Sequence, residues 1–202
     1  METKVELIKS TKYITSKWSG GTTSELLIYP DGSKYSERNF KWRISSAKIE
    51  ASKSLFTQLP GITRHIMVID GKIILEHQDR YKKVLGPFDK DSFMGVWETK
   101  SYGKATDFNL MLTNNFAGDL EAYFIEEEQV FDIAINESSG KNVTNVFYVL
   151  NGSVEIDVNK KKFNIEEKDL LYVTGLSTGE KMIRLANRSI CKLVVIRALI
   201  WG

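Results

Sequence analysis

Apolar and polar residues alternate along much of the chain, as they do in strands whose two faces differ. In the clearest example Phe40, Trp42 and Ile44 fall on one face. Arg43 and Ser45 fall on the other. Successive side chains of a strand point to opposite faces, so this spacing predicts a strand. No convincing amphipathic helix of ten or more residues stands out, and the many β-branched and aromatic residues also favour strands. The pattern predicts an all-β protein.

Two dipeptides typical of tight turns interrupt apolar runs of the chain. Asp70-Gly71 lies between one pair of apolar runs, and Asn151-Gly152 lies between another. Asp-Gly and Asn-Gly favour the type I′ turn, because both of its central residues need a positive φ. We therefore expect a β-hairpin at each dipeptide.

The surroundings of the two dipeptides resemble each other, which indicates an internal repeat. Residues 69–73 read IDGKI, and residues 150–154 read LNGSV. A β-unit that occurs twice in 202 residues predicts two small barrels or sandwiches in one chain. We place their boundaries at residues 1–116 and 117–202.

The composition narrows the classes of function. Lys and Arg number 28 against 26 Asp and Glu, a net charge of +2, so the basic excess of a general nucleic-acid binder is missing. No stretch has the length of a membrane span, and the first residues lack the apolar region of a signal peptide. We expect a cytoplasmic protein that contacts neither membrane nor nucleic acid. The single cysteine, Cys191, excludes an intrachain disulfide and is expected to be a core residue.

Four motifs in the first half of the chain carry a family resemblance. They are WSGGTTSE (18–25), FKWRISSA (40–47), FTQLPGITR (56–64) and DFNLM (107–111). Together they resemble the HutD/Ves family, and residues 147–154 with 168–173 are similar to the central part of a cupin. The resemblance implies a double cupin, that is, two RmlC-like β-barrels or jelly rolls. For one branch of the family it implies a role in histidine utilisation and a ligand such as formylglutamate, without an established catalytic activity.

A metal centre of the cupin kind would need several histidines and a carboxylate. The chain has two histidines, His65 and His77, on opposite arms of the hairpin expected at Asp70-Gly71. Cupins usually place their carboxylate ligand seven residues before the turn glycine, and Arg64 and Asn145 stand there. A guanidinium cannot ligate a metal ion, because it is never deprotonated. We expect no metal or other cofactor, and structural roles for both histidines.

Arg64 would then lie inside the first barrel, where relatives hold a metal ligand. An arginine with neutral donors suits a carboxylate or phosphate, through bidentate charge-assisted hydrogen bonds. We expect a ligand site formed by Arg64, Arg43, Ser45, Asn109, Trp18, Thr22 and Glu25. In the alternative interpretation both arginines are structural and pair with Glu25, Asp70 or Asp107.

The function predicted from these residues is metal-free binding of a small anionic metabolite, and the family resemblance implies a role as an accessory factor in amino-acid catabolism. The alternative is a metal-independent enzyme on a carboxylated or sugar-like substrate, with Glu25 or Asp107 as its base. A nearby arginine is expected to lower the pKa of either carboxyl group. Gly20 and Gly21 would let the backbone approach the cavity mouth, with Trp18 as a wall. Cupins often pair through sheet edges, so a homodimer is possible.

Overall fold

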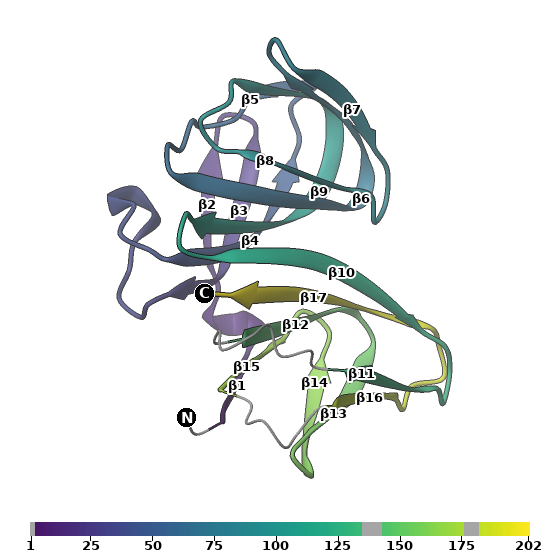
Figure 1. Cartoon of the computed structure of the whole chain (residues 1–202). Helices are drawn as coiled ribbons and strands as arrows, with labels where there is room; N and C mark the ends of the chain where they lie inside the picture. The colour runs from purple at the N-terminus through teal and green to yellow at the C-terminus, as the bar shows by residue number, and fades with distance from the viewer. Residues whose placement is uncertain (1–2, 135–142, 176–181) are drawn as a thin grey trace. The chain divides into compact units, whose positions relative to one another are not determined.

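The computed structural model describes residues 3–134, 143–175 and 182–202, and nearly all of them lie in strands or loops (Figure 1). The all-β prediction is confirmed. The chain divides into two compact units, residues 13–120 and residues 1–12 with 121–202. This division differs from the predicted boundary, since the first strand, β1 (Lys4–Ile8), pairs with β15 of the later unit. No helix in the described part of the chain has the length and apolarity needed to cross a membrane.

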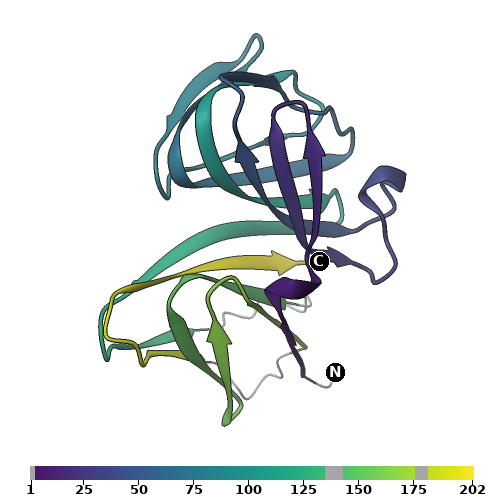
Figure 2. The same ribbon diagram turned by 180° about the vertical axis from the view of Figure 1, so that it is seen from behind.

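The unit of residues 13–120 is built on one eight-stranded sheet. The path β2-β3-β4-β9-β6-β7 carries most of it, while β5 pairs with β9 and β8 pairs with β6. Figure 2 shows the β2–β3 hairpin in purple. A short 3-10 helix, η2 (Tyr35–Glu37), lies between β3 and β4. The strands are β2 (Ile14–Trp18), β3 (Gly21–Tyr29), β4 (Trp42–Ile49), β5 (Lys53–Leu55), β6 (Ile62–His77), β7 (Tyr81–Leu85), β8 (Lys90–Met94) and β9 (Thr99–Thr113).

Strand β6 continues through Asp70-Gly71, so the hairpin predicted there is wrong. Its first half pairs with β8, its second half pairs with β7, and β9 follows both halves. The ladder shifts register between Val68 and Asp70, as at a β-bulge. Gly71 has a φ of +81°, and a Cβ there would lie 2.5 Å from the carbonyl oxygen of Lys104. The positive φ therefore serves a bend within a strand.

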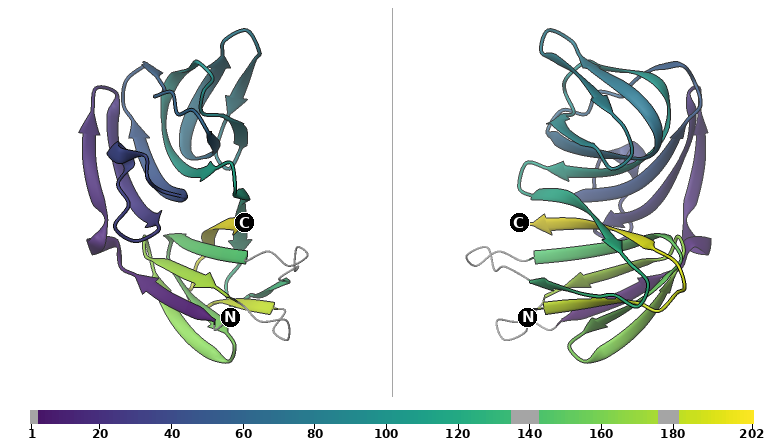
Figure 3. Two further views of the ribbon diagram at one scale, coloured as in Figure 1. Left: turned by 60° about the vertical axis from the view of Figure 1, so that its left-hand side comes forward. Right: turned by 90° about the vertical axis from the view of Figure 1, so that its right-hand side faces the viewer.

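The unit of residues 1–12 and 121–202 is a sandwich of two sheets. Their strand orders are β1-β15-β12-β17-β10 and β11-β16-β13-β14, and Figure 3 shows the strands from two sides. β10 (Ala117–Ile125) enters this unit from the other, and the 3-10 helix η1 covers Ser10–Lys12. The remaining strands are β11 (Val130–Ala134), β12 (Val143–Asn151), β13 (Ser153–Val158), β14 (Lys161–Glu166), β15 (Leu170–Thr174), β16 (Met182–Asn187) and β17 (Leu193–Trp201).

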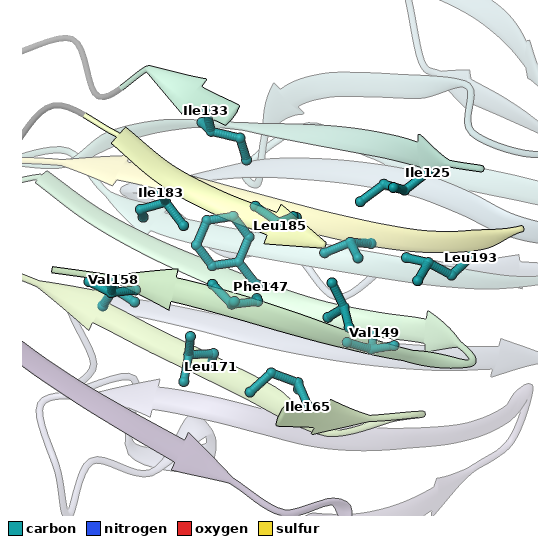
Figure 4. Packing of buried hydrophobic residues seen from close by; sticks show 14 residues of the cluster. Ile125, Ile133, Phe147, Val149, Val158, Ile165, Leu171, Ile183, Leu185 and Leu193 are labelled. Carbon is teal, nitrogen blue, oxygen red and sulfur yellow. The ribbon is translucent and has the colours of Figure 1, made fainter. Parts of the chain in front are cut away.

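The core of this sandwich consists of apolar side chains from both sheets. Phe147 and Leu171 belong to the five-stranded sheet, and Ile165 and Leu185 belong to the four-stranded sheet (Figure 4). Asn151-Gly152 is the point where the chain leaves β12 in one sheet and enters β13 in the other. No hairpin joins these two strands, so the second hairpin prediction is also wrong.

The internal repeat is visible in matching hydrogen bonds. The N–H of Phe88 donates to the carbonyl of Val68 at 2.6 Å, and the N–H of Lys168 donates to the carbonyl of Val149 at 2.7 Å. Both donors have a positive φ, 67° and 66°. Val68 and Val149 each stand three residues before one of the two turn glycines, whose φ values are 81° and 73°. The two units therefore share one local design, and residue n in the first corresponds to residue n+81 in the second along β6 and β12–β13.

Two smaller expectations are wrong, and a third agrees with the structure. His65 and His77 lie on the same strand, β6, and not on two arms of a hairpin. His77 is buried, with Nδ1 2.8 Å from Thr99 Oγ1 and Nε2 3.0 Å from Asp91 Oδ2, which is a structural role. Cys191 is exposed, so its assignment to the core is wrong, because β17 begins two residues later.

Candidate functional site

The unit of residues 13–120 contains a cavity of about 360 Å³. Its lining includes five of the seven predicted site residues, namely Trp18, Arg43, Ser45, Arg64 and Asn109. The order β4-β9-β6 explains why they meet. Ser45 faces Asn109 across one ladder, and Arg64 faces Met111 across the other. Residues on alternate positions of neighbouring strands share one face of a sheet, which here is the face that lines the cavity.

Arg43 is held by groups of the protein. Its Nε donates to Glu25 Oε2 at 2.6 Å, and an Nη atom donates to Ser45 Oγ at 3.0 Å. Its guanidinium carbon lies 4.5 Å from the ring centre of Tyr35. Arg43 and Glu25 thus form the ion pair that the structural alternative expected. Glu25 is not one of the described residues that line the cavity, and it acts on the site by pairing with Arg43.

Arg64 lacks such partners. Its side chain is 8% exposed, and its guanidinium carbon lies 4.6 Å from the ring centre of Phe56 and 5.4 Å from that of Phe93. Nε is buried without a hydrogen-bond partner, and no ion pair or hydrogen bond of the side chain is found within the described ranges. Burial lowers the pKa of Arg64, Tyr35 and Asp107 act to raise it, and the charge of Arg43 lowers it. A guanidinium nevertheless stays protonated, so an unneutralised cation faces the cavity.

Asp107 and Asn109 lie beside this cation on β9. The backbone N–H of Ala47 donates to Asp107 Oδ1 at 3.3 Å, and Asn109 Nδ2 donates to the same oxygen. Asn109 Oδ1 is buried without a partner. Burial raises the pKa of Asp107 to about 7, although Arg64 acts to lower it. Arg64 lowers this pKa as expected, but desolvation outweighs the charge, so the net pKa is raised.

Trp18 lines the cavity, and the two nearby glycines pack closely against its ring and against a neighbouring strand. A Cβ on Gly20 would lie 2.0 Å from the Trp18 ring, and a Cβ on Gly21 would lie 1.9 Å from the Lys48 carbonyl oxygen. The close backbone approach was predicted, but Thr22 is not among the described residues that line the cavity. Thr23 lines the cavity instead, because side chains alternate along β3 and Thr23 pairs with Ala47.

Sequence reasoning missed several aromatic residues of the site. Tyr35 and Phe56 line the cavity and stack on its two arginines. Phe56 begins the motif that ends at Arg64, so the motif itself contained a signal for it. Tyr35 lies in η2, where no periodicity or motif marked it.

The other unit shows how this fold can satisfy a buried arginine. By the repeat, Asn145 corresponds to Arg64, and Arg197, opposite Phe147, corresponds to Asn109, opposite Ile66. Arginine and asparagine have thus exchanged positions between the units. Arg197 donates to Asn145 Oδ1 at 2.8 and 2.5 Å, to Glu121 Oε2 at 3.0 Å and to Tyr123 Oη at 3.2 Å.

Solved structures of known proteins resemble this chain over most of its length. The conserved protein of unknown function PA5104 from Pseudomonas aeruginosa PAO1 is 21% identical over 98% of each chain, with a TM-score of 0.81. HutD from Pseudomonas fluorescens SBW25 is 19% identical, with a TM-score of 0.65, over 96% of this chain and 98% of that chain. A mutant of Bacillus subtilis oxalate decarboxylase OxdC is 8% identical, with a TM-score of 0.67, over 95% of this chain and 76% of that chain.

These similarities show the fold, and the protein is cupin-like in class. The HutD family model matches residues 10–191, and the chain belongs to the HutD family. The family resemblance of the four sequence motifs is thereby confirmed.

The residues of the cavity do not fit a divalent metal. Bacillus subtilis oxalate decarboxylase contains Mn(II) centres. In this chain the described cavity lining has two guanidinium groups and no histidine. Within the described ranges, no group of three or more His, Cys, Asp or Glu residues is placed to hold a metal ion. Guanidinium groups offer no lone pair to a metal and repel it, so this donor set suits an anion.

Proposed function

We propose that the protein binds a small carboxylate without a metal in the cavity of residues 13–120, as an accessory factor in histidine or amino-acid catabolism. The observation that carries this proposal is Arg64, a buried arginine whose side chain has no polar partner among the described residues. A buried charge needs a counter-charge or hydrogen bonds, since leaving it unpaired costs several kcal/mol or more. An anionic ligand supplies both.

The second unit supports this interpretation by contrast. Arg197 directs its guanidinium nitrogens at oxygen atoms of the protein, and Arg64 leaves its own facing a cavity. Arg197 also lines a cavity, of about 410 Å³, so the difference between the two arginines is that the protein supplies hydrogen-bond partners to Arg197 and, within the described ranges, not to Arg64. Arg43 adds no net charge, because Glu25 neutralises it. The free positive charge at this site is that of Arg64.

The size and lining of the cavity agree with a small organic acid. A volume of about 360 Å³ is at the small end of the range of ligand pockets. Apolar and aromatic side chains such as Trp18, Tyr35 and Phe56 surround the charged end. The name of the family refers to histidine utilisation, and formylglutamate is the ligand that we test first.

Calorimetric titration of formylglutamate into the purified protein tests the proposal. Loss of a charge-assisted bidentate contact removes roughly 1.5–3 kcal/mol, so Arg64→Lys should weaken binding by about ten- to a hundredfold. Arg64→Ala should abolish binding while the fold survives. Arg184→Lys, an exposed arginine paired with Asp132 in the other unit, is the matched control and should bind normally. Absence of carboxylate binding, or full binding by Arg64→Ala, would overturn the proposal.

One observation also favours a metal-independent enzyme. Asp107 lines the cavity, and its pKa of about 7 suits a group that exchanges protons at neutral pH. Incubation of the protein with formylglutamate and other carboxylates, followed by chromatography, separates the two functions. Turnover that Asp107→Asn removes supports the enzyme, whereas unchanged ligand supports the binding protein.

A further inference from the structure

Asp107 lines the cavity, and only one of its two carboxyl oxygens has a hydrogen-bond partner within the described part of the chain. Oδ1 accepts hydrogen bonds from the backbone N–H of Ala47 and from Asn109 Nδ2. Oδ2 has no hydrogen-bond partner among the described residues. It is also not among the fully buried polar atoms that lack one, so it is not completely enclosed by the protein. Because Asp107 lines the cavity, Oδ2 faces the space where a ligand would lie. A proton on Asp107 would therefore sit on Oδ2 and point at that ligand.

The charges around Asp107 explain what state the carboxyl group must have when a carboxylate binds. Arg64 on β6 is the charged group that acts on Asp107, Arg43 on β4 and Tyr35 on η2 act on Arg64 in turn, and Glu25 on β3 pairs with Arg43. Glu25 is committed to Arg43, so a ligand carboxylate and Asp107 would share the one cation of Arg64. Two carboxylates at one site do not both ionise, because their like charges repel.

The other unit indicates that this carboxyl group is not required by the fold. Asp107 faces Val68 in the β6–β9 ladder, and the corresponding partner of Val149 in the other unit is Val195. The unit whose arginine is satisfied by protein groups thus has valine at this position. The unit whose arginine is open has an aspartic acid.

We propose that Asp107 belongs to the ligand site as a protonated carboxyl group, so that the cavity takes up a carboxylate together with one proton. This inference rests on the proposed function and adds a residue and a proton to it. The proton comes from solvent, is held at Oδ2 and is donated in a hydrogen bond to one ligand oxygen. No bond of the ligand breaks, and Arg64 donates to the ligand from the other side.

The titration of Asp107 sets the pH range of the effect. With a pKa of about 7, the carboxyl group is protonated at pH 6 and ionised at pH 8 before ligand binds. A bound carboxylate raises this pKa further, since it places a second negative charge nearby. His65 lies on β6 as well, but burial lowers its pKa from the ordinary 6.5, so its charge change is centred below pH 6.5.

Calorimetry of formylglutamate binding tests the inference, because its carboxyl groups stay ionised across the range. Affinity should fall about tenfold between pH 6 and pH 8, the change in the fraction of protonated Asp107. Titrations in two buffers of different ionisation enthalpy should show uptake of about 0.1 proton at pH 6 and about 0.9 proton at pH 8. The measurement uses the wild-type protein and does not depend on the folding of any variant.

Two variants make the assignment specific. Asp107→Asn keeps the shape and offers an N–H donor but does not titrate, so its affinity should be equal at pH 6 and pH 8, with no proton uptake. Glu155→Gln removes a carboxyl group in the other unit, where Glu155 pairs with Lys162 and Arg188, and should keep the tenfold pH effect.

The outcomes distinguish this inference from the proposed function. Tight binding that is independent of pH, without proton uptake, would overturn the role of Asp107 and leave carboxylate binding intact. A wild-type pH effect in Asp107→Asn would also overturn it. Absence of carboxylate binding at every pH would overturn both.

Discussion

Replacement of Arg64 by methionine separates stability from binding. The substitution removes the buried charge but keeps an unbranched side chain between Phe56 and Phe93. Desolvation of an unpaired guanidinium costs several kcal/mol, and its stacking on aromatic rings returns about 2 kcal/mol or more. We therefore expect Arg64→Met to raise the free energy of unfolding by about 1–2 kcal/mol. In a chain of this length the melting temperature should rise by about 2–8 °C.

The matched control is Arg197→Met in the other unit. Removal of this guanidinium leaves Asn145 Oδ1 without its donor and breaks the ion pair with Glu121, which keeps only the hydrogen bond from Tyr123. Breaking such a buried network costs about 3–5 kcal/mol, so the melting temperature should fall. Two arginines of equal burial, 8% and 5% exposed, are thus expected to respond in opposite directions.

Differential scanning calorimetry at pH 6, without added carboxylate, measures both variants. At this pH Asp107 is protonated and does not offset the charge of Arg64. A melting temperature that falls as far in Arg64→Met as in Arg197→Met would refute the reasoning. Arg64 would then be a structural residue, and the ligand site would have to be sought elsewhere.

Two further predictions concern Asp107 and Gly21. The pKa of Asp107 is raised from 3.8 to about 7, so the folded state holds the extra proton and stability should fall as pH rises from about 4 to 7. At about 1.4 kcal/mol per pKa unit the loss is about 4 kcal/mol, and urea unfolding of Asp107→Asn should not show it. Gly21→Ala places a Cβ 1.9 Å from the Lys48 carbonyl oxygen and should destabilise by about 1–3 kcal/mol, whereas Gly86→Ala meets only ordinary contacts at 3.6 Å and should not.

Much of the site was predictable because it is carried by strand alternation and by local motifs. Alternation placed Arg43 and Ser45 on one face, the cupin spacing before Gly71 pointed to Arg64, and a family motif pointed to Asn109. All four line the cavity. These signals do not show which group neutralises each arginine. Nothing in the spacing shows that Glu25 neutralises Arg43 while Arg64 stays open.

The errors have physical causes of the same kind. The Asp-Gly dipeptide indicates a residue with a positive φ. Such a residue occurs both in hairpin turns and at bends within a strand. The deciding fact is that β9 follows β6 on both sides of Gly71, which is a long-range pairing. Thr22 and Thr23 are neighbours in sequence, so their side chains point to opposite faces of β3. Which of the two faces the cavity is set by the pairing of β3 with β4. The pKa of Asp107 depends on burial, which a residue's neighbours in sequence do not reveal.

A crystal structure of the protein with formylglutamate at pH 6 tests the central claim most directly. The account predicts one ligand carboxylate in the cavity of residues 13–120, within hydrogen-bond distance of the Arg64 guanidinium and of Asp107 Oδ2. Ligand bound elsewhere, or an empty cavity in which Arg64 keeps its aromatic neighbours at saturating ligand, would contradict it.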